Sequence, residues 1–316
     1  MRSALRASVV GCLLACVTCS VSTAGSKHSE RAIGREQRQP ALVASYFQTD
    51  PLADSTTLIA GDALDRLTYE ASPPAFPGDR PGSLTARYDS TRPSGLLGLW
   101  IGQDLTERSD FTVAAIAVIR SEGFVADPDG FFQISWGVWN SAATGLRRTG
   151  DPLDYSGDTF ELLEFDYFPN VSPLFGGPFL SPAIFGRADT DHPGFGALGS
   201  FANASFAFGP QVALPFDAPL LMVLEHRAAS GEVVVGVHRV IGPRRTTPVP
   251  GAIAVVDSSA LGYRSYAFDV IGPTLWNDGF GGPAPSLQAS VVFHALIARS
   301  GFYDSVDAIL RTPPRR

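Results

Sequence analysis

The chain has 316 residues, of which 45% are hydrophobic and 17% are charged, so it can bury a large core and is not disordered along its length. Its formal net charge of −7 repels phosphate backbones, which excludes nucleic acid as an expected partner. The 32 Gly and 25 Pro residues favour many short strands joined by turns, because Pro fits neither helix interiors nor central strands and Gly marks turns.

The first 24 residues have the pattern of an export signal. Arg2 and Arg6 supply a positive end, and residues 7–17 form an apolar stretch that is too short to span a bilayer. The small residues at 22–24 fit cleavage by a signal peptidase. As an alternative, the four residues that end at Cys16 resemble the lipobox of bacterial lipoproteins, in which the cysteine is lipidated. Both routes predict an extracytoplasmic protein, which is secreted, periplasmic or held at the envelope membrane through that lipid alone.

Reactive side chains are concentrated before the folded part. Residues 25–41 are polar and aperiodic, which predicts a flexible tether, and they contain the only lysine, Lys27. All three cysteines lie in or beside the leader. The predicted single β-sandwich domain, 42–312, therefore has no thiol for a disulfide, a metal site or a nucleophile, and no amine for Schiff-base chemistry. Residues 313–316 are expected to be a frayed tail.

Runs of β-branched and aromatic residues, separated by turn-forming residues, predict the strands. The signals are weak before residue 92 and become regular from residue 111. A short helix is expected near the end of the chain, at 303–310. The expected strands are 42–47, 83–88, 111–119, 131–140, 159–168, 220–227, 232–241, 252–256, 265–270 and 290–298. This series favours an all-β fold of two packed sheets.

Side chains alternate between the two faces of the strand expected at 131–140. One face is apolar and is assigned to the core: Phe132, Ile134, Trp136 and Val138. The opposite face is polar with one tryptophan: Gln133, Ser135, Gly137 and Trp139. An indole ring can stack on a sugar, so Trp139 and its neighbour Gln133 are candidate ligand-binding residues. The remaining tryptophans, Trp100, Trp136 and Trp276, are expected in the core.

The expected hairpin at 220–241 has a register that can be counted back from its loop. This count places Arg227 opposite Glu232 and His226 opposite Val233. His226 then faces the core and His238 faces away from it. The two histidines therefore cannot hold one metal ion together.

The segment from Glu161 to Asn170 carries the most informative polar pattern in the chain. Residues two apart on a strand point the same way, so Glu164 and Asp166 project from one face with about 7 Å between their bases, and Glu161 projects from the other. Asn170 follows in a turn and brings an amide oxygen beside the two carboxylates. Oxygen ligands grouped in this way suit a hard cation such as calcium.

This segment resembles the metal-binding strand of legume-type lectins, which belong to the concanavalin-like jelly-roll group. The family pattern, Glu-x-Asp-x-aromatic-x-Asn, matches Glu164, Asp166, Phe168 and Asn170. The resemblance implies a two-sheet antiparallel jelly-roll sandwich that binds carbohydrate. It also implies that Glu164 and Asp166 ligate a transition metal, and that Asp166, the Phe168 carbonyl and Asn170 ligate calcium.

The match to the lectin pattern is incomplete. The family supplies a further Asp and a His soon after the Asn, whereas the nearest substitutes here are Asp189, Asp191 and His192. The stretch 131–185 is also similar to exported bacterial sandwich proteins, a group that brings no activity with it.

Two other interpretations of the acidic strand stay open. A pair of carboxylates is typical of a strand face whose charges are solvated or paired with arginines, here Arg147, Arg148 or Arg187. It is also found in laminarinase-type glucanases of the same fold, where retaining hydrolysis needs two carboxyl groups about 5 to 5.5 Å apart. In the glucanase pattern a second Glu follows the Asp, whereas here Glu161 precedes the pair and lies on the opposite face. This order favours binding over catalysis by Glu164 and Asp166.

The function expected from the sequence is therefore an exported, lectin-like module for a glycan or polysaccharide surface, with calcium as the candidate cofactor and no organic cofactor. Glycoside hydrolysis is the alternative from the enzyme class. A structural component of the cell envelope, with no small ligand, is the alternative from a third class.

Overall fold

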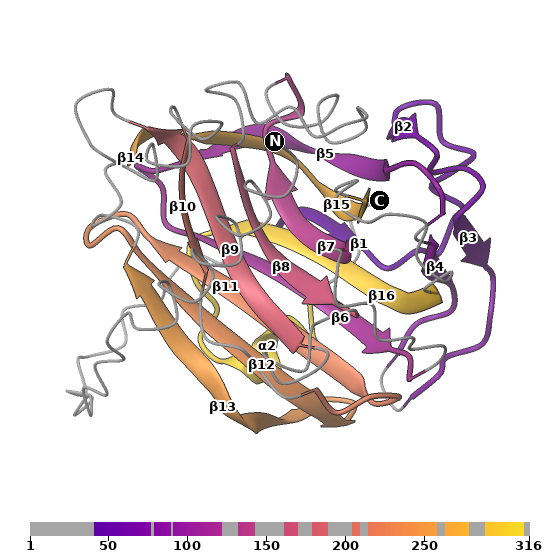
Figure 1. Cartoon of the computed structure of the whole chain (residues 1–316). Helices are drawn as coiled ribbons and strands as arrows, with labels where there is room; N and C mark the ends of the chain where they lie inside the picture. The colour runs from indigo at the N-terminus through magenta and orange to yellow at the C-terminus, as the bar shows by residue number, and fades with distance from the viewer. Residues whose placement is uncertain are drawn as a thin grey trace.

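The computed structural model describes residues 41–76, 79–89, 91–121, 132–142, 161–169, 179–188, 204–208, 214–257, 263–277 and 288–312. These residues form sixteen strands and one short helix, α2 (Val306–Ile309). Figure 1 shows the strands in two layers. Within the described residues, no helix is long and apolar enough to cross a membrane.

The first layer, here called sheet A, has the strand order β13-β12-β11-β6-β16-β4-β3, and β1 also pairs with β16. Every pair in it is antiparallel. Its strands are β1 (Ala41–Ser45), β3 (Leu67–Glu70), β4 (Ser83–Asp89), β6 (Phe111–Ile119), β11 (Pro219–Arg227), β12 (Glu232–Gly242), β13 (Arg245–Asp257) and β16 (Gln288–Ser300).

The second layer, sheet B, has the order β10-β9-β8-β7-β15-β5-β2, and β14 also pairs with β9. It is antiparallel throughout. Its strands are β2 (Leu58–Gly61), β5 (Gly95–Thr106), β7 (Phe132–Trp139), β8 (Leu162–Phe168), β9 (Phe179–Ala188), β10 (Ala204–Phe208), β14 (Tyr263–Ser265) and β15 (Ala267–Asn277).

The connections explain why this is a jelly-roll sandwich rather than two independent sheets. The chain passes from sheet A to sheet B and back along β4, β5, β6 and β7, and it crosses again between β15 and β16. Consecutive strands from β4 to β7 therefore lie in opposite layers, so the chain links the two sheets repeatedly. The all-β, two-sheet antiparallel sandwich expected from the sequence is confirmed.

The core lies between the layers and follows the strand alternation. From β7, Ile134, Trp136 and Val138 point into it, as expected, and the Trp136 ring meets Phe293 of sheet A edge-on at 5.5 Å. Each large apolar side chain buried in this way contributes about 1.5 to 3 kcal/mol to the free energy of unfolding. The sandwich is therefore stabilised mainly by contacts between the two sheets.

The hairpin of β11 and β12 has the register expected from the sequence, with Arg227 opposite Glu232 and His226 opposite Val233. His226 faces the interior, where its Nε2 accepts a hydrogen bond from the Tyr266 hydroxyl and its Nδ1 donates to the Ser109 carbonyl at 2.8 Å. Burial lowers the pKa of His226, so the neutral ring is favoured. This histidine links the sheets and is not a metal ligand in this arrangement.

Several strands have no counterpart in the sequence prediction, namely β2, β3, β5, β9, β10 and β14. The largest omission is β5, because Gly95, Gly98 and Gly102 interrupt its apolar pattern and are typical of turns. In the structure these glycines lie inside a 12-residue strand. A side chain at Gly95 would place its Cβ 2.6 Å from the Ala63 nitrogen, so the glycine permits a close backbone approach.

Candidate functional site

The two acidic residues of β8 lie on the outer face of sheet B. Leu163, Phe165 and Tyr167 point into the core, so Glu164 and Asp166 point away from it. Their exposed fractions are nevertheless only 0% and 2%. The pair is therefore not solvated, whereas its pairing with Arg147, Arg148 or Arg187 stays a prediction, because these side chains lie outside the described residues. The position of Glu164 and Asp166 on one face of one strand is as expected.

The neighbouring strand β7 is shaped to accept both carboxylates. Asp166 lies opposite Ser135, whose hydroxyl donates a hydrogen bond to the Asp166 carboxylate at 2.8 Å. Glu164 lies opposite Gly137, where a Cβ atom would come within 2.6 Å of the Glu164 Cβ. The glycine therefore leaves the space that the Glu164 side chain needs. The structure therefore places two of the predicted metal ligands, Glu164 and Asp166, on one face of β8.

Glu161 does not join the acidic pair. Its Oε2 accepts hydrogen bonds from the Asn140 side chain at 3.2 Å and from the Ala267 backbone at 3.0 Å. It therefore ties the start of β8 to the ends of β7 and β15. This role is structural and was not expected from the sequence.

The remaining candidate metal ligands are placed only in part. Phe168 ends β8 and is buried, with 6% of its surface exposed, while Asn170 and the residues at 189–192 lie outside the described residues. Among the described residues, no group of three or more His, Cys, Asp or Glu side chains could hold a metal ion. Calcium takes about six to eight oxygen ligands. The calcium site at Glu164, Asp166, Phe168 and Asn170 therefore stays a prediction.

Trp139 shares the outer face of sheet B but is only 1% exposed. Its ring lies over two glycines of neighbouring strands, since Cβ atoms built on Gly98 and Gly272 would lie 3.2 Å and 3.1 Å from it. The expectation that Trp139 stands on an open polar face is therefore wrong. Gln133 pairs with Trp276 across the sheet, and its side chain lies outside the described residues. A ligand-binding role for either residue stays a prediction.

The open tryptophan on this face is Trp100, which was expected in the core and is 48% exposed. On β5, Leu97 and Ile101 point inward, so Trp100 points outward. It lies beside Val270, which in turn lies beside Trp139. The pairing of β2 with β5 ends at Gly98, so Trp100 is next to the unpaired part of β5 in the described structure. Strand β5 was not predicted from the sequence, so Trp100 could not be assigned to the inner or the outer face of a sheet.

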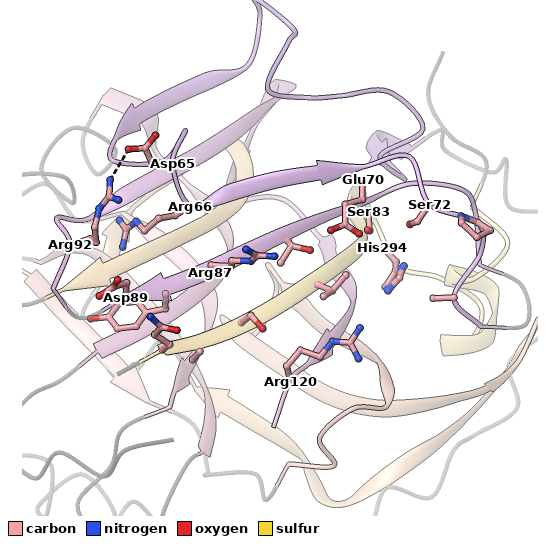
Figure 2. A pocket seen from close by; sticks show the side chains of 18 of the residues that line it. Asp65, Arg66, Glu70, Ser72, Ser83, Arg87, Asp89, Arg92, Arg120 and His294 are labelled. Atoms are coloured by element: carbon pink, nitrogen blue, oxygen red, sulfur yellow. Dashed lines mark hydrogen bonds and ion pairs between the residues drawn. The ribbon is translucent and has the colours of Figure 1, made fainter. Parts of the chain in front are cut away.

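A second candidate site lies on the outer face of sheet A, where a groove of about 800 Å³ opens between β3, β4 and β16 (Figure 2). This groove could not be predicted from the sequence, because the residues that line it come from segments that are far apart in the chain. Its lining is mainly polar and charged: Asp65, Arg66, Glu70, Ser72, Pro73, Pro74, Ala75, Ser83, Thr85, Arg87, Tyr88, Asp89, Arg92, Arg120, Gln288, Ala289, Ser290, Val292 and His294.

The fold of this chain has similar counterparts among solved structures. No protein-family model and no curated protein matches the chain. Among solved structures, it is similar to the carbohydrate recognition domain of Emp47p, with 14% identity over 84% of this chain and 95% of that chain and a TM-score of 0.41. It is also similar to lectin II from Ulex europaeus, with 9% identity over 79% and 94% of the two chains and a TM-score of 0.40.

An alginate lyase from Klebsiella pneumoniae is similar as well, with 11% identity over 70% of this chain and 82% of that chain and a TM-score of 0.38. The two-sheet antiparallel sandwich that the sequence resemblance implied is the architecture of the described strands. These likenesses concern the fold alone.

Proposed function

We propose that this chain is an exported, lectin-like carbohydrate-binding protein and that it binds sugar on the outer face of sheet B. The observation that carries the proposal is the exposed indole of Trp100 on the same face as the Glu164–Asp166 pair. A half-exposed tryptophan offers an apolar ring face for a sugar and keeps its N–H near water. The export signal at residues 1–24, or the lipobox ending at Cys16, would deliver the protein to a glycan surface outside the cytoplasm.

One polar group that follows Trp100 on β5 is suited to sugar hydroxyls. The Asp104 carboxylate is exposed and is an acceptor at the surface. Gln103 instead donates a hydrogen bond to the Ser300 hydroxyl of β16 at 3.1 Å, so it is directed toward sheet A. A stacking ring with nearby acceptors is the combination that orients a neutral saccharide.

The acidic pair supports the proposal in a different way. With the Phe168 carbonyl and Asn170, Glu164 and Asp166 would hold a calcium ion, whose charge would offset the burial of the two carboxylates. We propose that the ion stabilises β8 and its following turn rather than contacting the sugar ring. Glycoside hydrolysis by the same pair is less well supported, because the third carboxylate, Glu161, accepts hydrogen bonds from Asn140 and Ala267 and does not join the pair.

The test is binding of purified protein to a panel of neutral β-glucans and galactans. Wild type should bind at least one of them, and Trp100→Ala should weaken that binding about tenfold or more, as for other central aromatic anchors. Ile253→Ala is the matched control, because Ile253 is a 58% exposed apolar residue on β13 of sheet A. Equal binding by Trp100→Ala and Ile253→Ala would overturn the proposed face.

The same incubations should release no new reducing ends. Release that disappears in Glu164→Gln would support the hydrolase instead, because it would require the buried carboxylate to reach a substrate.

A further inference from the structure

The groove on the outer face of sheet A is built from alternate residues of two paired strands. On β4, Leu84 and Ala86 point into the core, so Ser83, Thr85 and Arg87 point outward. On β16, Val291 and Phe293 point inward, which leaves Ser290, Val292 and His294 on the groove side. The groove floor is therefore rigid sheet, and its volume of about 800 Å³ is within the range of small-molecule sites.

The backbones of three arginines lie in a row across the strands beside this groove. The Arg87 backbone N–H donates to the Arg66 carbonyl at 2.9 Å, Arg87 lies opposite Ser290, and the Arg120 N–H donates to the Ser290 carbonyl at 3.0 Å. Arg120 lies 3.6 Å from Asp217, and Arg66 lies 3.5 Å from Asp62. Arg87 is exposed and makes no ion pair with any described residue. One guanidinium in the row is therefore available to an anion.

Arg66 provides a second donor, at the end of the groove where Arg92 lies (Figure 2). It is only 4% exposed, and its Nη1 has no hydrogen-bond partner among the described residues, while its Nη2 donates to the Pro93 carbonyl. Burial lowers the pKa of Arg66, but a guanidinium in a protein stays protonated. A buried charged donor without an acceptor is costly. An acceptor oxygen from a ligand would satisfy it.

His294 lies at the opposite end and is 4% exposed. Its Nδ1 is 3.0 Å from the Asp79 carboxylate without hydrogen-bond geometry, and neither ring nitrogen has a hydrogen-bond partner among the described residues. Phe76 holds the ring edge-on at 5.0 Å. With Asp79 favouring a proton on Nδ1, Nε2 is left as an acceptor for a ligand hydroxyl. Ser83 and Glu70, which pair across β4 and β3, add polar groups to this end.

The two ends are separated along the floor of the groove. Ser83 and Arg87 are four residues apart on β4, which is about 13 Å at the rise of a strand. Figure 2 shows Glu70, Ser83 and His294 at one end and Arg66 and Arg92 at the other, with Arg87 reaching between them. A ligand that meets both ends must therefore be extended, with an anionic group at Arg87 between the ends and hydroxyl groups toward each end.

We propose that this groove binds a short acidic saccharide, with a sugar carboxylate at Arg87 and sugar hydroxyls at Arg66, His294 and Ser83. Polyphosphates fit less well, because Asp65, Glu70 and Asp89 also line the groove and the chain has a net charge of −7. The proposal does not depend on sugar binding at sheet B, since no residue is shared between the two faces.

The experiment is calorimetric titration of the full chain with a trisaccharide of galacturonic acid, a neutral galactose trisaccharide and a sulfated galactose trisaccharide. Wild type should bind the uronate most tightly. Arg87→Gln should weaken uronate binding about tenfold or more, the loss expected when a charge-assisted hydrogen bond is removed. Arg87 is exposed and unpaired among the described residues, so this variant should fold normally.

Arg108→Gln is the matched control, because its side chain is 89% exposed on another part of the surface. It should bind the uronate like wild type. The proposal is overturned if the uronate does not bind at millimolar concentration, if the neutral trisaccharide binds equally well, or if Arg87→Gln and Arg108→Gln behave alike. Preferential binding of the sulfated trisaccharide would contradict the assignment of a carboxylate.

Discussion

On the outer face of sheet B the two acidic side chains of β8 are buried, whereas on the outer face of sheet A Arg87 of β4 is open to solvent. The difference follows from position in the sheet. Both strands have a neighbour on each side. Beside β8, Gly137 of β7 leaves space in which the Glu164 side chain packs, whereas β4 lies next to the short edge strand β3. Strand alternation therefore indicates the face on which a charge lies but not whether that face is open.

The rest of sheet A's outer face sharpens this contrast. Beyond the groove it is apolar, and Ala114, Ile116 and Leu221 pack there with Ile309 of α2. The C-terminal helix thus covers one part of the sheet and leaves the charged part uncovered. A single face can hold both a packed cluster and an open polar groove.

The largest loss of stability is expected from adding a side chain at Gly272, where the backbones of β15 and β5 approach each other closely. A Cβ atom at Gly272 would lie 1.8 Å from the Leu97 carbonyl oxygen and 3.1 Å from the Trp139 ring. Gly272→Ala should therefore lower the free energy of unfolding by about 3 kcal/mol or more, because overpacking moves backbone as well as side chains. Urea unfolding followed by tryptophan fluorescence measures this change.

Gly242→Ala on sheet A is the control, since its nearest neighbour would be the Arg245 Cβ at 3.9 Å. It should change the free energy of unfolding by less than about 1 kcal/mol. Equal stability of the two variants would show that the outer face of sheet B is not closely packed around Trp139.

The same glycines mark the limit of what the sequence predicts. Regular strands such as β6, and the register of the β11–β12 hairpin, follow from local pattern and are confirmed. β5 escaped prediction because its glycines serve contacts with Ala63 and Trp139, which only the three-dimensional register reveals. Trp100 was expected to be buried and Trp139 to be exposed, and the structure shows the reverse. The cause is the same, because the exposure of each ring depends on neighbours from other strands.

The groove residues illustrate a second limit. Arg66, Arg87 and Arg120 lie on three segments of the chain, and they form a row only through the pairing of β4 with β16. The acidic pair of β8, by contrast, is visible in the sequence because both residues lie on one strand. Sites built within a single strand can be proposed from pattern alone, but sites built across a sheet cannot.

A smaller effect is expected from calcium on the acidic pair. If the ion binds only the folded state, a hundredfold excess over Kd adds about 2.7 kcal/mol of stability, which raises Tm by a few degrees. Thermal melts with millimolar calcium and with chelator should therefore differ for wild type and coincide for Asp166→Asn. Asp104→Asn, at an exposed carboxylate of β5, should keep the wild-type difference. If calcium does not raise the Tm of wild type, or raises the Tm of Asp166→Asn equally, the acidic pair does not bind calcium.

The central claim is that the two outer faces are independent binding sites with different ligand chemistry. The most direct test is to titrate wild-type protein with the galacturonate trisaccharide in the presence of a saturating neutral saccharide identified on the glycan panel. Independent faces predict an unchanged Kd for the uronate and one site for each ligand. An apparent Kd that rises in proportion to the concentration of the neutral saccharide would show competition for one site and contradict the account.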